Sequence, residues 1–562
     1  MRPGVEAVVV SHHNPLPDQT GQAGRVGAVR KPLVRHEETV RRLVVLSLLY
    51  LILPVQAMFP LIDPDIWWHL RTGQWIIAHG TVPTADPFST YGMGKPWIAY
   101  SWLFEVLVYG LYQAFGLVGL VLYTIIFSLM ITAALHALVR KLELSFVSEV
   151  ALTVLGLMSM KPLMHPRPWF FTILFFILEL DILLAARRSG DSRRLLLLPP
   201  LFALWANTHI QFVYGLFVLG LATAEPLIDR LCRRFLIESD TKAIPFSRLL
   251  LVTTACAIAT LATPYHLSLY RVVYEYSRQT VPFYYITELH ALLFRQPSDW
   301  FVLAATLLAA FSLGWRQDVR PFPLLLLVTG AFLSFRAFRD AWFVAIAAVT
   351  IIAPSCSTAA SADRFALTKL RVFLVAGVVA FMLVAVGKLR HISDPHLESA
   401  LAKTYPVAAA AVVEERGYSG PLYNHFDWGG YLIWRLPHLS VAMDGRTNLH
   451  GDERIERSLA TWAGQRNWAS DPELAAARLV IADINSALAS LLRLDSRFEL
   501  VYEDTVAAIF VAHPQSGRGV LVESQFQKDR QESTERGGAN KPWLLKAQPK
   551  ILLVFDTEKS MP

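Results

Sequence analysis

LVVLSLLYLILPVQAMFPLIDPDIWWH, residues 43–69, joins an apolar run over 43–62 to a short polar stretch that begins at Asp63. The apolar run is long enough to cross the hydrocarbon core of a bilayer. The stretch that follows, Asp63-Pro-Asp65-Ile-Trp67-Trp68-His69, holds two carboxylates, two indoles and an imidazole. Carboxylates are costly to place near lipid, and those found there are often functional. This junction therefore predicts a membrane protein and marks the first place to look for its chemistry.

The composition of the whole chain is that of a polytopic membrane protein. Of the 562 residues, 54% are hydrophobic and 17% are charged, whereas a soluble globular protein carries roughly 25% charged residues. The formal net charge of +7 comes from arginines spread over short loops, which argues against nucleic acid as a partner. Residues 1–42 show no cleavable signal peptide and are predicted to be a disordered cytosolic tail, and residues 514–562 a mostly disordered tail.

The apolar runs and the arginines between them predict about eleven crossings within a transmembrane domain over 43–388. Cytosolic loops are enriched in Lys and Arg. Arg41-Arg42 and Arg140-Lys141 can both be cytosolic only if the chain returns once between residues 62 and 139. Residues 97–115 are therefore expected to form an amphipathic helix in the outer interface, where Trp and Tyr are favoured. The expected crossings are 43–62, 117–139, 147–161, 168–186, 195–208, 210–226, 248–264, 300–314, 321–336, 338–355 and 370–388.

The same topology places the N-terminus in the cytosol and residues 389–513 on the opposite side of the membrane. This region is predicted to be a small extracytoplasmic α/β domain. Strands are expected at Leu479–Asp483, Phe498–Tyr502 and Val506–Val511, and helices over 395–415, with Asp394 as the N-cap, and over 471–477.

The first outer loop, residues 63–116, carries the candidate catalytic residues. Asp63-Pro64 predicts a helix start, with Asp63 as the N-cap and Pro64 at the first helical position. Asp65 then falls in the first turn, where the helix dipole favours the ionised form, and His69 lies one turn further on the same face. A carboxylate beside an imidazole suits a general base or a metal ligand. The alternatives are a capping role for Asp63, dipole compensation for Asp65 and an interfacial position for His69; the helix is expected to end at Gly80.

The order of these parts resembles the polyprenyl-phosphate-sugar-dependent glycosyltransferases of the GT-C superfamily, in particular the aminoarabinose and rhizobial lipopolysaccharide transferase branch. The residues that carry the resemblance are Asp65, Gly80, Pro83, Lys95-Pro96-Trp97 and Gly116. The branch has a glutamate where this chain has Ile66, so the branch's second acid is missing and Asp63 is the candidate to replace it. Further motifs that resemble an uncharacterised bacterial group of the same superfamily are Arg167-Pro168, Trp205–His209 and Tyr423–Tyr431.

The resemblance implies an inverting hexosyl or pentosyl transfer at the outer face of a bacterial inner membrane. The donor would be a polyprenyl-phosphate-linked sugar and the acceptor a cell-envelope lipid, glycan or protein. Asp65 would be the base or a metal-binding carboxylate, and the divalent ion that the resemblance allows is Mg or Mn at Asp65 and Asp63.

Further residues are implied to bind substrate. Arg167, Arg336 and Arg339 are candidates to hold the donor phosphate, for which the planar guanidinium is suited. The alternative is that they only snorkel at helix ends. Trp68 can stack on a sugar or anchor the chain at the interface, and Asn207 and His209 can instead bond across helices. Asp427 and Trp428 resemble the acceptor motif of oligosaccharyltransferases, with tight turns as the alternative.

Two other classes of function stay open from the sequence alone. One is a transporter or flippase of lipid-linked substrates, and the other is a non-catalytic membrane scaffold. Transporters commonly show internal repeats and acids near the bilayer midplane. This chain shows no repeat, and Glu179 and Asp181 are expected near the cytosolic end of their helix, which favours the glycosyltransferase.

Overall fold

The structure is a computed structural model that describes residues 27–58, 63–232, 244–317, 320–356 and 364–513. The C-terminal residues 514–562, for which a disordered tail is predicted, lie outside the described residues, as do residues 1–26. Helix α1 already begins at Gly27, inside the segment 1–42 that the sequence assigns to the tail. The boundary at residue 42 is therefore not where the first helix starts.

Eleven described helical segments follow the predicted apolar runs. They are α1 (Gly27–Leu51), the second part of α3 (Trp102–Arg140), α4 (Phe146–Met160), α5 (Trp169–Ser189), α6 (Leu198–Thr208), α7 (Phe212–Cys232), α8 (Phe246–Ala259), α11 (Pro297–Arg316), α12 (Pro321–Arg336), α13 (Ala341–Cys356) and α14 (Lys369–Leu389). Within the described residues, seven helical stretches are long and apolar enough to cross a membrane. The chain is therefore a membrane protein, while the number of crossings stays a prediction. Helix α13 is packed by α4, α11 and α12, and α14 lies against α1.

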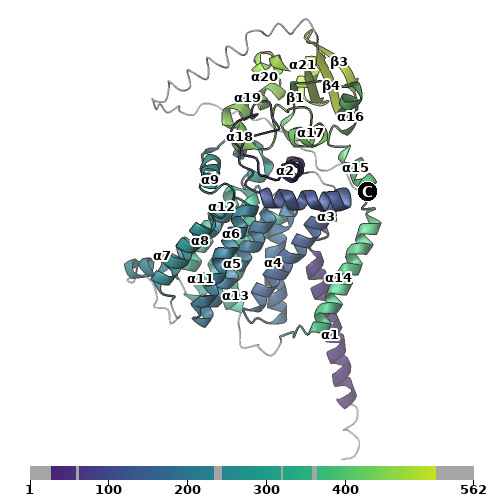
Figure 1. Cartoon of the computed structure of the whole chain (residues 1–562). Helices are drawn as coiled ribbons and strands as arrows, with labels where there is room; N and C mark the ends of the chain where they lie inside the picture. The colour runs from purple at the N-terminus through teal and green to yellow at the C-terminus, as the bar shows by residue number, and fades with distance from the viewer. Residues whose placement is uncertain (1–26, 59–62, 233–243, 318–319, 357–363, 514–562) are drawn as a thin grey trace, which may run out of the picture. The chain divides into compact units, whose positions relative to one another are not determined.

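A break in α3 separates the segment predicted to lie along the interface from the crossing that follows it. Gly116 has φ 60° and ψ −144°, so two helices meet there. Glycine adopts a positive φ without steric cost, and a Cβ at this position would lie 1.8 Å from Asp394 Oδ2. The Val118 amide donates to Asp394 Oδ1 at 3.0 Å, which caps the second helix. The first segment begins at Trp102, later than the predicted residue 97. Figure 1 shows it lying across the ends of α4, α5 and α6.

Helix α2 (Ile66–His79) begins two residues later than the sequence predicts, because Pro64 and Asp65 precede it. Asp63 still caps it: Asp63 Oδ1 accepts from the backbone N–H groups of Asp65 at 2.9 Å and Ile66 at 3.3 Å. The predicted end is confirmed, since Gly80 closes the helix at φ 65°. Helix α2 packs along α3 on one side and α17 on another.

Short elements line the loops between the membrane helices. The α-helices among them are α9 (Ser268–Arg278) and α10 (Pro282–Tyr285). The 3₁₀ turns are η1 (Gln56–Met58), η2 (Lys161–Leu163), η3 (Ser192–Leu197), η4 (Thr287–Leu289) and η5 (Phe338–Asp340).

The region after α14 contains a four-stranded sheet in the order β1-β2-β4-β3. Strand β1 (Leu422–Asn424) is parallel to β2 (Leu479–Asp483), and β2 is antiparallel to β4 (Ala507–Ala512), with Ile481 opposite Ile509. With β3 (Phe498–Glu503), the three predicted strands are confirmed. Strand β1 escaped prediction because three residues carry no periodicity.

Helices surround this sheet. They are α15 (Asp394–Leu401), α16 (Val407–Arg416), α17 (Gly429–Arg435), α18 (Thr447–His450), α19 (Asp452–Trp462), α20 (Pro472–Ala476) and α21 (Ala487–Leu492), with 3₁₀ turns η7 (Phe426–Trp428) and η8 (Trp468–Ser470). The single helix expected over 395–415 is two helices, since Pro406 cannot donate the backbone hydrogen bond that a continuous helix needs. Its N-cap is Ser393 and not Asp394.

The first outer loop pairs with this α/β region through its backbone. The Thr90 amide donates to the Val441 carbonyl at 2.9 Å, and the Val441 amide donates to the Phe88 carbonyl at 3.2 Å. Helix α19 is hydrogen-bonded to the loop that follows α9: Asp452 Oδ2 accepts from the Thr280 amide at 2.7 Å. The loops 63–116 and 265–299 and the α/β region therefore form one packed assembly.

Candidate active site

Arg167 connects the two aspartates of the opening motif. It follows η2 and precedes α5, flanked by Pro166 and Pro168. Its Nε donates to Asp63 Oδ2 and its Nη1 to Asp65 Oδ2. The backbone is held as well, since the Tyr123 hydroxyl donates to the Arg167 carbonyl at 3.1 Å. Three candidates from the sequence, Asp63, Asp65 and Arg167, are thus in direct contact.

Glu288 adds a third carboxylate that the sequence reasoning did not select. It lies on η4, with Oε2 3.6 Å from Arg167 Nη2 and Oε1 3.9 Å from Arg339 Nη1. Both distances exceed that of a hydrogen bond, so Glu288 lies loosely between two guanidinium groups. No periodicity or motif in the loop 265–299 singled it out. These five residues, Asp63, Asp65, Arg167, Glu288 and Arg339, are called the Asp63–Arg167 site below.

Burial controls the protonation of this site. Burial raises the pKa of Asp65, and the charge of Asp63 adds to that effect, while Arg167 opposes it. Burial also raises the pKa of Glu288, against the opposing charges of Arg167 and Arg339. Carboxyls with raised pKa values are better proton acceptors than ordinary surface carboxylates.

His69 is bound to a partner other than Asp65. Its Nδ1 lies 3.0 Å from Glu105 Oε1, and both side chains are buried. Burial, together with Arg167 and His209, holds the pKa of His69 well below its usual value, which favours the neutral imidazole. The contact with Asp65 is a backbone one, in which the His69 amide donates to the Asp65 carbonyl. The geometry therefore assigns His69 to the packing of α2 on α3.

Arg336 lies outside the direct contacts of the site. It ends α12, and its guanidinium stacks over the Phe283 ring at 4.4 Å. Arg339, one helical turn later in η5, is the residue that reaches Glu288. Of the three arginines proposed from the sequence for a phosphate, the structure brings Arg167 and Arg339 together.

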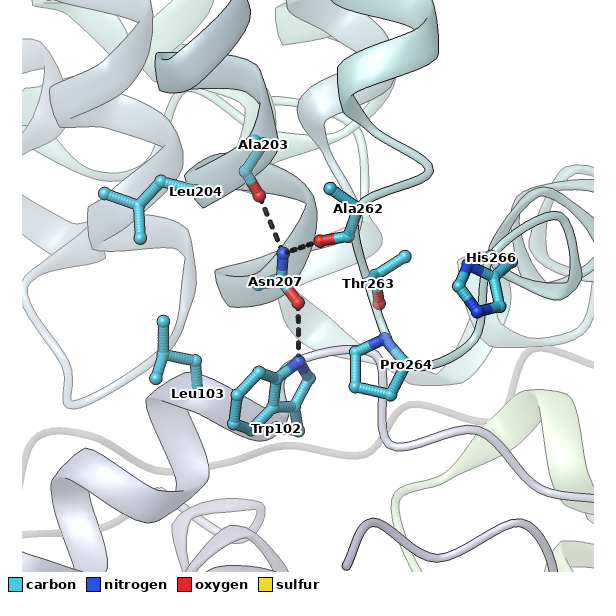
Figure 2. Close-up of a pocket in the computed structure, with 9 residues that line it drawn as sticks. All are labelled: Trp102, Leu103, Ala203, Leu204, Asn207, Ala262, Thr263, Pro264 and His266. Carbon is cyan, nitrogen blue, oxygen red and sulfur yellow. Dashed lines mark hydrogen bonds between the residues drawn. The ribbon is translucent and has the colours of Figure 1, made fainter.

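Asn207 and His209 form hydrogen bonds to other helices, which is the alternative to substrate binding that the sequence left open. Asn207 Oδ1 accepts from Trp102 Nε1 at 2.8 Å, and its Nδ2 donates to the carbonyls of Ala203 and Ala262 (Figure 2). These bonds tie α6, the turn after α8 and the start of α3 around an apolar hollow of about 580 Å³. His209 Nδ1 lies 2.7 Å from Thr172 Oγ1 on α5.

The tryptophan candidates are packed inside the fold. Trp68 is buried, with its ring centroid 3.6 Å from that of His69. Trp428 is also buried and donates from Nε1 to the Thr404 carbonyl at 3.0 Å. Asp427, in contrast, is about half exposed, and its carboxylate lies 3.8 Å from His425 Nδ1. Of these three residues, only Asp427 offers a free polar face.

Glycines let the α/β region approach the first outer loop. A Cβ on Gly445 would lie 1.9 Å from Asp65 Oδ1, and a Cβ on Gly430 would lie 2.5 Å from the Pro64 carbonyl oxygen. Such distances are impossible for real side chains, so both positions need glycine. Gly445 thus places backbone directly against Asp65, and Gly430 places it against the preceding residue, Pro64.

A second group of charges lies in the same assembly and is fully buried. Arg446 donates from Nε and Nη2 to the two oxygens of Asp444, at 2.8 and 2.7 Å, and from Nη1 to Asp86 at 2.5 Å. His450 Nε2 lies 3.2 Å from Asp444 Oδ2. Although burial acts to raise the pKa of Asp444, Arg446 and His450 outweigh it and hold that pKa well below its usual value. These four residues, Asp86, Asp444, Arg446 and His450, are called the Asp86–Arg446 cluster below.

The predicted metal ligands Asp63 and Asp65 do not fit a divalent ion as they are arranged. Arg167 is bonded to both carboxylates. Within the part of the chain that the structure describes, no group of three or more His, Cys, Asp and Glu side chains is placed to hold a metal.

Comparisons with known proteins complete the picture. No family model matches the chain, and no curated protein matches it. Similar solved structures exist. One is ArnT from Cupriavidus metallidurans bound to undecaprenyl phosphate, with a TM-score of 0.47 and 13% identity over 85% of this chain and 98% of that one.

Two further matches are from Archaeoglobus fulgidus. The oligosaccharyltransferase AglB, in complex with an inhibitory peptide and a dolichol-phosphate, has a TM-score of 0.47 and 12% identity over 80% of this chain and 70% of that one. The oligosaccharyltransferase in a complex with Zn and sulfate has a TM-score of 0.44 and 13% identity over 79% and 68%. All three matches lie below 25% identity and below a TM-score of 0.5, so the resemblance to the GT-C superfamily stays a prediction from the sequence.

Proposed function

We propose that this protein is an integral membrane glycosyltransferase. It would transfer a sugar from a polyprenyl-phosphate donor to a cell-envelope acceptor at the outer face of the membrane. The observation that carries this proposal is the contact of Asp65 with Arg167 in a mostly buried site that also holds Glu288 and Arg339. Such a site offers a base and two cations within reach of one substrate.

Asp65 is proposed as the base. Its carboxylate directly precedes helix α2, where the helix dipole favours the ionised form. Burial nevertheless raises the pKa of Asp65, which brings it closer to the pH at which the protein works. The bond to Arg167 fixes the orientation of the carboxylate, and a fixed orientation is what proton transfer requires.

Arg167 and Arg339 are proposed to bind the donor phosphate. The phosphodiester of a sugar linked to a polyprenyl phosphate carries one negative charge. The polyprenyl phosphate that leaves is a monoester and carries two. The added charge forms as the sugar leaves, so cations fixed beside it stabilise the transition state more than the bound donor. Guanidinium groups match phosphate oxygens in geometry.

The proposed reaction is a single displacement. The acceptor hydroxyl oxygen forms a bond to C1 of the sugar while the bond from C1 to the phosphate oxygen breaks. The hydroxyl proton goes to Asp65, and the electron pair of the broken bond stays with the polyprenyl phosphate. Attack from the side opposite the leaving group inverts the configuration at C1, as the GT-C resemblance implies.

The orientation proposed for the chain in the membrane is compatible with this reaction. Positive charges at Arg41-Arg42 and Arg140-Lys141 favour a cytosolic N-terminus. With that orientation, the Asp63–Arg167 site, the loop 265–299 and the α/β region all face outward. We propose that the protein lies in a bacterial inner membrane, with the N-terminus in the cytosol and the α/β region on the opposite side.

One experiment tests the proposal. Purified full-length protein is given a panel of radiolabelled polyprenyl-phosphate sugars and an envelope lipid extract, and transfer is followed by thin-layer chromatography. Wild type and Asp229→Asn, a change at an exposed position on α7, are expected to transfer label, and Asp65→Asn is not. Equal transfer by Asp65→Asn, or none by wild type with any donor, would overturn the proposal. Movement of the donor across liposomes without transfer would instead identify a flippase.

A further inference from the structure

Both carboxylate oxygens of Asp63 already accept hydrogen bonds. Asp63 Oδ1 accepts from two backbone amides, at 2.9 and 3.3 Å. Asp63 Oδ2 accepts from Arg167 Nε. Each oxygen of Asp63 therefore has a donor, and a metal ion would have to displace one of them.

Asp65 is restricted in the same way. Its Oδ2 accepts from Arg167 Nη1. Its Oδ1 faces the backbone at Gly445, so closely that a Cβ there would lie 1.9 Å away. Backbone on one side and guanidinium on the other leave this carboxylate little room for the water ligands that Mg usually keeps.

Charge leads to the same conclusion. Three carboxylates in this site, Asp63, Asp65 and Glu288, are matched by two guanidinium groups, Arg167 and Arg339. A divalent ion bound at the carboxylates would be repelled by Arg167, which contacts all three of them. Mg also requires oxygen ligands in a nearly octahedral arrangement at about 2.0–2.1 Å, and one oxygen each of Asp63 and Asp65 is bonded to Arg167 here.

The geometry points to Arg167 as a built-in replacement for the divalent cation: its guanidinium holds the acidic motif in the way a metal ion would, and the site functions without one. This inference concerns the site that the proposed function uses, but it makes a separate claim about what that site binds. The guanidinium is permanently ionised and cannot be removed by a chelator.

The test measures Mn²⁺ binding and not transfer. Mn²⁺ is titrated into purified full-length protein in detergent, and the electron paramagnetic resonance signal of free Mn²⁺ is followed. Wild type is expected to leave the signal unchanged at equimolar ion. Arg167→Met frees the three carboxylates while keeping an unbranched, uncharged stem, so it is expected to bind one Mn²⁺ at least tenfold more tightly than wild type.

Two controls and a substitute variant make the result specific. Adding Asp65→Asn to Arg167→Met should abolish the new binding. Arg271→Met, which removes an exposed arginine paired with Glu275, should behave as wild type. If Arg167→Met does not elute as a monodisperse peak, Arg167→Gln takes its place.

Two outcomes would overturn the inference. The first is stoichiometric Mn²⁺ binding by wild type that Asp65→Asn removes, which would make the acids a metal site despite Arg167. The second is no binding by either wild type or the folded Arg167 variants, which would show that the acids form no cation site for Arg167 to fill. Neither depends on transfer, so a failed transfer assay would leave this test intact.

Discussion

Two arginine–carboxylate groups anchor the first outer loop, and they differ in how completely their bonds are satisfied. In the Asp86–Arg446 cluster, the side chains of Asp86, Asp444 and Arg446 are at most 1% exposed, and each guanidinium contact is within 2.8 Å. In the Asp63–Arg167 site, Arg167 is 10% and Glu288 25% exposed, and they stand 3.6 Å apart. A saturated group can only hold the fold together, whereas an incompletely paired and accessible one can accept a ligand.

The largest expected effect is a loss of transfer rate without a loss of stability. Asp65→Asn keeps the shape of the side chain but removes the proton acceptor, so transfer should fall by about 10²- to 10⁴-fold. The melting temperature should stay close to that of wild type, because the amide oxygen can still accept from Arg167. Initial rates and thermal unfolding of the same preparation check this. If the rate of Asp65→Asn falls only in proportion to its loss of folded protein, Asp65 has a structural role like that of the Asp86–Arg446 cluster.

The next largest effect is expected on the stability of the protein, at the Asp86–Arg446 cluster. Arg446→Met leaves Asp86 and Asp444 buried without their cation, and removing one partner of a buried pair costs about 3–5 kcal/mol. The free energy of unfolding, followed by tryptophan fluorescence in denaturant, should fall by that amount. Arg435→Met, which breaks an exposed pair with Glu414, should cost about 0–1 kcal/mol. Similar losses for the two variants would show that burial does not distinguish the Asp86–Arg446 cluster.

A glycine tests how closely the two regions depend on each other. A methyl group at Gly445 would overlap Asp65 Oδ1, so Gly445→Ala should displace the carboxylate. A displacement of about 1 Å can cost on the order of 10²-fold in rate. Gly110→Ala is the matched control, since nothing lies within 4 Å of its Cβ position. If Gly445→Ala retains the wild-type rate, Asp65 does not need the position that the structure gives it.

The smallest expected effect is a displacement of the pH profile. A base works when ionised, so transfer should be present above the raised pKa of Asp65 and lost as the pH falls through it. The acidic limb of the rate should therefore lie above the ordinary Asp value of 3.8. Arg167 lowers the pKa of Asp65 and Asp63 raises it, so Arg167→Gln should move the limb to higher pH and Asp63→Asn to lower pH. Residual rates measured across pH check this, and movement of both variants in one direction would contradict it.

Much of the fold could be predicted because its signals are local. Apolar runs mark the membrane helices, Gly80 ends α2, and Gly116 marks the break in α3. The errors also have local causes. The sequence predicts the start of α2 at Pro64, two residues too early, because an Asp-Pro pair can also lie just before a helix. Here Asp65, the next residue, occupies the N-cap position. Strand β1 was too short to leave a pattern.

The site was predicted only in part, because its bonds join residues that are distant in sequence. Asp63 and Asp65 stood out in a short motif, and Arg167 through a family resemblance, but their mutual contact spans 104 and 102 residues. The bond from Arg446 to Asp86 spans 360 residues, and no spacing rule reaches that far. Glu288 is one of several charged residues in the loop 265–299, and no motif distinguishes it from the others. The roles of these residues stay predictions until the variants are measured.

The capping of α3 by Asp394 bears on how the α/β region stays in place. Only residues 390–393 separate α14 from α15, and Asp394 is bonded to the start of the α3 crossing. A module on so short a tether meets its partner surface at an effective concentration in the millimolar range. Its contacts with the first outer loop, among them the buried bond from Arg446 to Asp86, therefore form within one chain and do not cost the entropy of bringing two separate molecules together.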